Sequence, residues 1–505
     1  MKLIWVVFIF LLVNSYKAQD IIGNVPMHRY VEREYLKDQI SNGGHSSIRP
    51  YLKEDFHDTL TKEIALSSND WFSIKALSDI ELGIDKTTQA FNLAARGGAG
   101  IGLSGTVKNR LNVEANYLYN YVDGPSYIDS LTSDLGVSPG FGLATTVGDA
   151  FGYHQLQGYL HYKANKFFAL QLGNGKNFIG DGYRSLLLSD VANNYPYFKI
   201  TTGVWNIKYV NLFTRQRDIG RPGGNLASKF SGKFTATHYL DWSISKSVNL
   251  GLFESIVWQA QDTLLDRGFD LNYLNPIIFY RPVEYQQGSA DNALMGINLS
   301  VNIAKKIKVY GQFVIDEFLL DEVKADSGWW ANKYGAQIGL KAHDIVIEGL
   351  DFQTEYSSVR PYTYSHGASV QNYGHDNGSL AHPYGSNYRE WLSFISYRKN
   401  KWIFEEQISL AVHGEDSISS VSYGGNIFQS YSNRPYNYGH FTGQGLKTSI
   451  FYSHLRISYL IHARSNIRAE LGYVFRERKN GLEYESNHYV YVGLKTNLWN
   501  RYNDY

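Results

Sequence analysis

A glycine-spaced stretch, residues 172–190, carries the side chains with the clearest chemical potential in the sequence. It reads LGNGKNFIGDGYRSLLLSD, so four glycines alternate with charged and amide residues before three consecutive leucines. Glycines at such spacing let the backbone turn sharply or approach a neighbour closely, and the polar side chains between them are then held at fixed positions. We expect this stretch to form a site. The alternative interpretation is a glycine-rich surface loop between two strands.

Two further blocks carry a similar mixture of side chains. Residues 271–296 hold Arg281 and Glu284 around a proline, and residues 360–387 hold three histidines. Sugars are bound by aromatic faces that stack on their apolar sides and by planar polar groups that take hydroxyls in pairs. The residues that supply this mixture are Asp181, Tyr183, Arg184, Tyr195, Tyr280, Arg281, Glu284, Tyr362 and Tyr364.

The three histidines do not predict a metal site. His366, His375 and His382 are spaced by nine and seven residues in a loop rich in Gly, Ser and Asn. Structural zinc sites use closer ligand pairs. We therefore expect no metal and no other cofactor, and we expect these histidines to make hydrogen bonds instead.

Catalytic patterns are equally weak. The adjacent carboxylates Asp316-Glu317 and Glu405-Glu406 would point to opposite faces of a strand, so neither pair can flank one glycosidic bond. No GxSxG nucleophile motif occurs. We expect a protein without enzymatic activity. A lipid or glycan hydrolase stays open as an alternative.

Composition limits the classes of partner and fold. The 505 residues include 48 Lys+Arg and 47 Asp+Glu, so no nucleic-acid partner is indicated. The absence of cysteine excludes disulfides, thiolate metal sites and acylation at a cysteine. The 40 tyrosines, 10 tryptophans and 47 glycines favour a β-rich protein whose surface meets two solvents.

The chain divides into three predicted segments. Residues 1–18 resemble a cleaved signal peptide, because Lys2 precedes an apolar run that is too short to span a bilayer. Residues 19–70 form a periplasmic lead-in with one short helix, since Val31, Tyr35, Leu36 and Ile40 recur at helical spacing before Gly43-Gly44. Residues 71–505 alternate with a period of two, as β-strands do.

Alternation is clearest near the carboxyl end of the chain. Between residues 467 and 475, Ile, Ala, Leu, Tyr and Phe occupy one face, while Arg468 and Glu470 lie on the other. Residues 455–463 show the same pattern. Alternation alone does not separate a soluble sandwich from a barrel in lipid, because the two bury opposite faces of the same pattern.

Loop lengths make that distinction. Tight polar turns near residues 109, 165, 246, 305, 343, 400 and 465 alternate with long segments near 123–151, 174–197, 260–290, 319–332, 358–388 and 414–444. Short turns on one rim and long loops on the other are typical of outer-membrane barrels. Splitting residues 197–215 around Val204-Trp205 gives about eighteen strands. A final alternating strand that ends near Trp499 resembles a barrel-insertion signal.

Taken together, the three blocks resemble the capsule-assembly Wzi-like family of outer-membrane β-barrels, and most closely its branch that includes the gliding-motility protein RemB. The similarity runs from about residue 70 to the end of the chain. It implies an all-β transmembrane antiparallel barrel of about eighteen strands in the outer membrane, which engages surface polysaccharide. The family's amino-terminal helical bundle is reduced in this sequence to one short helix.

The sequence therefore predicts an outer-membrane barrel that binds surface polysaccharide and supports capsule or exopolysaccharide assembly, or adhesion and gliding. Expected partners are surface polysaccharide, outer-membrane lipid, and motility or secretion proteins. A diffusion channel for small solutes is the main alternative. Another is that Arg281 and Glu284 pair with each other or with lumen charges and rigidify a plug. The predicted binding residues are Asn174, Lys176, Asp181, Tyr183, Arg184, Arg281, Glu284, Arg360, His366, His375 and His382.

Overall fold

The computed structural model describes residues 23–56, 72–88, 90–108, 110–219, 230–261, 267–278, 291–418, 420–462, 466–496 and 500–505. The predicted signal peptide, Tyr280, Arg281, Glu284 and Trp499 lie outside these residues.

The described strands form a closed antiparallel barrel of 18 strands, in which the last strand pairs with the first. The number and the closure confirm the fold predicted from alternation and loop length. The strands are β2 (Phe72–Thr87), β3 (Phe91–Val107), β4 (Leu111–Asp123), β8 (Ala150–Lys163), β9 (Phe168–Gly175), β11 (Tyr195–Val204), β12 (Ile207–Asp218), β13 (Ser231–Ser243), β14 (Val248–Gln259), β15 (Asn292–Ile303), β16 (Ile307–Glu317), β17 (Lys333–Ala342), β18 (Leu350–Val359), β21 (Tyr388–Lys399), β22 (Trp402–Glu415), β23 (Leu446–His462), β24 (Ile467–Lys479) and β25 (Tyr484–Lys495). A short strand, β7 (Thr145–Val147), pairs with the end of β8.

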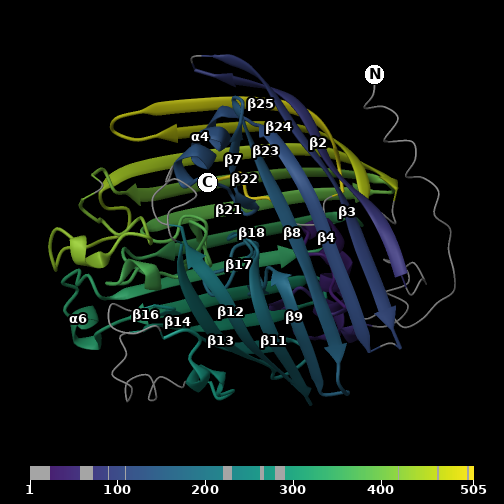
Figure 1. Ribbon diagram of the computed structural model, residues 1–505, viewed down its shortest axis with the longest axis horizontal. Helices are drawn as coiled ribbons and strands as arrows, with labels where there is room; N and C mark the ends of the chain where they lie inside the picture. Colours follow the sequence, from purple (N-terminus) through teal and green to yellow (C-terminus); the bar gives the residue numbers. More distant parts are fainter. Residues whose placement is uncertain are drawn as a thin grey trace.

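The two ends of the barrel differ in their connections. Residues 164–167, 205–206 and 304–306 are among the short turns at one end. At the other end, long connections carry α4 (Ser126–Leu135), β5 (Val137–Ser138), β6 (Gly142–Leu143), η3 (Leu271–Leu274), α6 (Leu320–Lys324) and η5 (Tyr431–Asn433). In Figure 1 the connection that bears α6 lies at the left of the barrel. Two connections at this end are nevertheless short, β2 to β3 and β24 to β25.

The strands turn their apolar faces outward. On β24, Leu471 is 47% exposed and Tyr473 is 38% exposed, whereas Arg468 and Glu470, on the opposite face, are each 6% exposed. This is the reverse of a soluble protein and is the pattern that a barrel in lipid requires. Within the described part of the chain, no helix is long and apolar enough to cross a membrane.

The predicted amino-terminal helix forms, and it packs against the barrel wall. Helix α2 (Arg29–Asn42) ends at Gly43, whose φ of 83° suits glycine. Its Arg33 pairs with Asp351 of β18 and with Asp344 of the β17–β18 turn, and its Ser41 hydroxyl donates to Lys305 O over 3.3 Å. The helix therefore lies at the short-turn end of the lumen, where the purple trace of Figure 1 is drawn toward the right.

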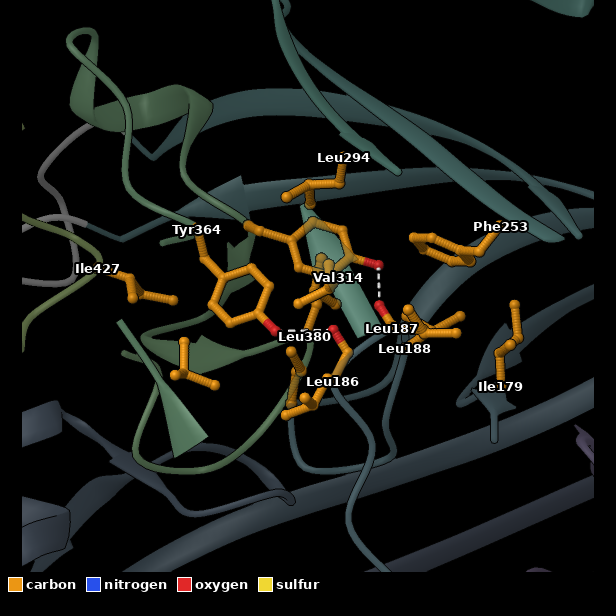
Figure 2. Packing of buried hydrophobic residues seen from close by; sticks show 14 of the residues in the cluster. Ile179, Leu186, Leu187, Leu188, Phe253, Leu294, Val314, Tyr364, Leu380 and Ile427 are labelled. Atoms are coloured by element: carbon orange, nitrogen blue, oxygen red, sulfur yellow. Dashed lines mark hydrogen bonds between the residues drawn. The ribbon is translucent and has the colours of Figure 1, made fainter. Parts of the chain in front are cut away.

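Segments from both ends of the barrel fold back into the lumen above α2 and fill it. It contains η2 (Lys53–Asp55), β1 (Ile48–Arg49) paired with β10 (Phe178–Ile179), and a small hairpin of β19 (Gly374–His375) and β20 (Gly378–Ser379) that follows η4 (Ser369–Gln371). The leucines Leu186, Leu187 and Leu188 are at most 3% exposed. They lie among Phe253, Leu294 and Val314 of the wall and Tyr364 and Leu380 of the 360–387 loop (Figure 2).

Candidate functional site

The segments that fill the lumen form a plug. The glycine-spaced stretch lies at the centre of this plug and is not a surface loop. Gly180 has a φ of 144°, and a Cβ there would overlap the Gln312 amide of β16. A Cβ at Gly182 would overlap the carbonyl of Arg184. The glycines are therefore needed where the segment presses against the wall and against itself. The segment adds β10 to β1, which joins it to the amino-terminal part of the chain.

Asp181 lies deep in the plug, at 2% exposure. Its carboxylate accepts a hydrogen bond from Asn298 over 2.9 Å and another from the Ser46 hydroxyl, and it pairs with Lys308 of β16 at 3.4 Å. Burial by itself would raise the pKa of Asp181, but the Lys308 ammonium and these two hydrogen bonds lower it to about 2. The charged Asp181 side chain thus links the plug to the barrel wall.

Arg184 and His382 converge on one carboxylate. Arg184 donates to both oxygens of Glu390 on β21, at 3.3 and 3.2 Å, and pairs with Asp504 at 2.9 Å. The His382 ring bonds the same Glu390 at 2.7 Å, and burial lowers the pKa of His382. Two of the sequence blocks therefore meet here. Arg184 is 1% and His382 is 0% exposed, so both side chains are closed off from solvent.

Lys176 and Tyr183 are also plug residues. The Lys176 ammonium donates to the carbonyls of Gly140 and Asp190 at 2.6 and 2.8 Å, and burial lowers the pKa of Lys176 to about 8. The Tyr183 ring packs edge-on against Phe394 of β21, with ring centroids 4.8 Å apart. Asn174, in contrast, belongs to β9, and its side chain donates to Leu156 O on the exposed side of the barrel.

The remaining described candidates belong to the 360–387 loop and its flank. The His375 ring contacts Asn194 O at 3.1 Å and accepts from the Arg217 amide at 3.2 Å. His366 accepts from the Ala368 amide at 3.2 Å. Arg360 donates to Asn332 O at 2.7 Å. These side chains order the loop, and within the described ranges no three His, Asp or Glu side chains gather as a metal site would need.

A large open cleft lies at the long-loop end, directly above the plug. It has a volume of about 930 Å³. One wall is formed by α4, and another by the ends of β22, β24 and β25, which contribute Glu415, Arg476 and Asn487. The floor includes Asn377 of the β19–β20 turn, together with Tyr384 and Tyr505. This volume lies within the range of about 300–1,000 Å³ that is usual for ligand sites.

Cavities inside the lumen are much smaller. Three of them have volumes of about 80, 60 and 40 Å³, and they lie around α2 and the glycine-spaced segment. The cleft at the long-loop end is thus much larger than these three cavities.

None of the nine described residues that the sequence predicts to bind ligand lines this cleft, although one of the three sequence blocks contributes other residues to its floor. The block 360–387 supplies Asn377 and Tyr384, whereas Arg476 and Arg478 come from the polar, inward face of the alternating strand β24. A local signal did exist, because RERK at residues 476–479 places two arginines on one face at the end of the strand.

No protein-family model matches the sequence, and no curated protein matches it. Among solved structures, the chain is similar to Wzi of Escherichia coli, an outer-membrane protein involved in group 1 capsule assembly that is described as a carbohydrate-binding β-barrel. The TM-score is 0.56 and the identity 12%, over 93% of this chain and 99% of that chain. This likeness confirms the barrel fold of the predicted family.

Two solved structures from Pseudomonas aeruginosa are more distant. The outer membrane protein OpdK has a TM-score of 0.44 at 9% identity, over 83% of this chain and 98% of that chain. OccK8 has a TM-score of 0.43 at 10% identity, over 83% of this chain and 97% of that chain. These two scores are too low to support an inference.

Proposed function

We propose that the protein is an outer-membrane barrel that binds surface polysaccharide in the cleft at its long-loop end. In this role it supports assembly of capsule or exopolysaccharide, or adhesion and gliding. The observation that carries the proposal is the cleft of about 930 Å³, which opens outward above a filled lumen. The predicted signal peptide would direct the chain out of the cytoplasm.

The chemistry of the cleft suits a glycan. The cleft is lined by the amide groups of Asn377 and Asn487 and the hydroxyl of Ser126, and Tyr384 and Tyr505 supply aromatic area. Side chains that both donate and accept hydrogen bonds match sugar hydroxyls, and aromatic rings match the apolar faces of sugars. The carbohydrate-binding description of Wzi supports the same class of ligand.

The filled lumen favours binding over free diffusion of solutes. The buried ion pairs of Asp181 and Arg184 hold the glycine-spaced segment across the barrel, and the cavity beside Arg29 and Tyr183 has a volume of only about 80 Å³. We propose that Lys176, Asp181, Tyr183, Arg184, His375 and His382 serve binding indirectly, because they fix the floor on which the glycan rests. The binding role of Arg281 and Glu284 stays a prediction.

The test is binding of the cell's own surface polysaccharide to the purified barrel in detergent. We expect saturable binding that is lost when Asn377→Ala and Tyr384→Ala alter the cleft floor, and no release of shortened glycan. In cells, deletion of the gene should reduce retained surface glycan, adhesion or spreading. Cells that keep all three would contradict the proposal, and glycan turnover by the purified protein would favour a hydrolase.

A further inference from the structure

The cleft carries an unequal set of charges. Among the described residues that line it are six carboxylates and two guanidiniums. The carboxylates are Asp134, Asp376, Glu415, Asp416, Glu483 and Glu485. Asp376 is paired outside the cleft with Arg217, at 2.6 Å, so five carboxylates face two arginines. A ligand in the cleft therefore meets an excess of negative charge.

The carboxylates are also the more accessible groups. The Glu483 and Glu485 side chains are 64% and 48% exposed, whereas Arg476 and Arg478 are 7% and 19% exposed. Arg478 is already held between Glu415 at 2.7 Å and Glu483 at 3.4 Å. Its positive charge is therefore offset within the wall.

Arg476 differs from Arg478 because part of its guanidinium lacks a hydrogen-bond acceptor. Its Nε and Nη1 atoms are buried and make no hydrogen bond, and the nearest carboxylate, Glu485, lies 3.6 Å from Nη1. Leaving buried charged donors unpaired is costly, because they lose their hydrogen bonds to water without gaining a partner. Arg476 lines the cleft, so a ligand there could supply the missing acceptors.

We propose that the cleft selects an uncharged or amine-bearing stretch of glycan and rejects acidic sugars. Arg476 donates to sugar oxygens, and the surrounding carboxylates accept from hydroxyl or ammonium groups. A uronate would bring a further negative charge within a Debye length, about 8 Å at physiological salt, of several carboxylates. This inference rests on the proposed function and adds the class of sugar to it.

The experiment separates the cell's own surface polysaccharide by anion exchange into a neutral or amine-bearing fraction and an acidic fraction. Binding of each fraction to the purified full-length barrel is then measured at two salt concentrations. We expect the first fraction to bind at least tenfold more tightly, and we expect higher salt to reduce that preference because screening weakens the repulsion. Tighter binding of the acidic fraction would overturn the inference while keeping the proposed function. Binding of neither fraction would overturn the proposed function itself.

Two variants test the residues involved. Arg476→Gln should weaken binding of the neutral fraction roughly tenfold, because it removes charge-assisted hydrogen bonds. Lys479→Gln is the matched control, since this exposed residue on the same strand does not line the cleft. The pair Glu483→Gln and Glu485→Gln should shift the preference toward the acidic fraction. Equal losses in Arg476→Gln and Lys479→Gln, or an unchanged preference in the double variant, would overturn the inference.

Discussion

At the scale of single residues, the ion pairs of Asp181 and Arg184 hold the glycine-spaced segment inside the barrel. Gly180 and Gly182 flank Asp181, and Arg184 follows two residues after Gly182. Their partners, however, are far away in the chain. Lys308 of β16 and Glu390 of β21 meet them only after the barrel has closed. Such long-range pairings leave no local sequence pattern. In the sequence, a residue of a buried ion pair therefore looks the same as a residue that contacts ligand.

The ion pair between Asp181 and Lys308 predicts that the stability of the protein depends on pH. The pKa falls from 3.8 to about 2 on folding, which corresponds to about 2 kcal/mol of stability. Since the folded pKa is the lower one, this stability is present above pH 4 and is lost as the pH falls toward 2. Thermal unfolding in detergent should show Asp181→Asn to be less stable than wild type at pH 7, with the difference shrinking toward pH 2. A difference that is the same at both pH values would contradict this role.

Arg184 gives a second residue-level prediction. Replacing it with methionine leaves Glu390 and Asp504 buried without their shared cation, and breaking such a buried pair costs about 3–5 kcal/mol. Hydrogen exchange of residues 176–194 should therefore rise strongly in Arg184→Met. Adding Glu390→Gln should restore part of the protection, because it removes one unpaired charge. Unchanged exchange in the single variant would show that the network does not hold the plug.

At the scale of elements, the strands were predictable and the interior was not. Strand alternation and turn residues are local, so the split between β11 and β12 and the short-turn end were both correctly predicted. Helix α2 was also correctly predicted from its apolar spacing. The sequence did not predict that α2, the glycine-spaced segment and residues 360–387 stack in one lumen. That stacking depends on closure of the whole sheet.

The segment after β25 shows how far this interior packing extends. Strand β25 ends at the short-turn end, whereas Tyr505 lines the cleft at the other end, so residues 500–505 run through the lumen (Figure 1). Asn500 donates to Asp190 at 3.2 Å, the Tyr502 hydroxyl donates to the same carboxylate, and Asp504 pairs with Arg184. These contacts therefore hold the glycine-spaced segment in place within the lumen.

Deleting residues 500–505 should loosen the plug without opening the barrel wall. The chain has no cysteine, so Ser185→Cys, at a position with 0% exposure, gives a single reporter thiol. Maleimide labelling of this thiol should be slow in the full chain and much faster after the deletion. Heat-modifiable migration in detergent gels is the control for an intact barrel. Equal labelling in both forms would mean that the segment does not secure the plug.

At the scale of the whole molecule, the protein is a closed barrel with an apolar exterior, a plugged lumen and a cleft at its long-loop end. Overall fold class follows from residue periodicity and loop lengths, which is why it was predictable. The choice between a channel and a binding protein depends on whether the lumen is filled, and that is set by long-range packing. The structure therefore adds most where the two functional alternatives diverge.

The measurement that tests this account most directly is electrical recording of the purified full-length protein in a planar lipid bilayer. A plugged barrel should insert, as shown by heat-modifiable protein in the same membranes, and should show no steady conductance. The variant that lacks residues 500–505 should give open events under the same conditions. A steady open conductance from the full-length protein would contradict the plugged, polysaccharide-binding barrel and would support a diffusion channel.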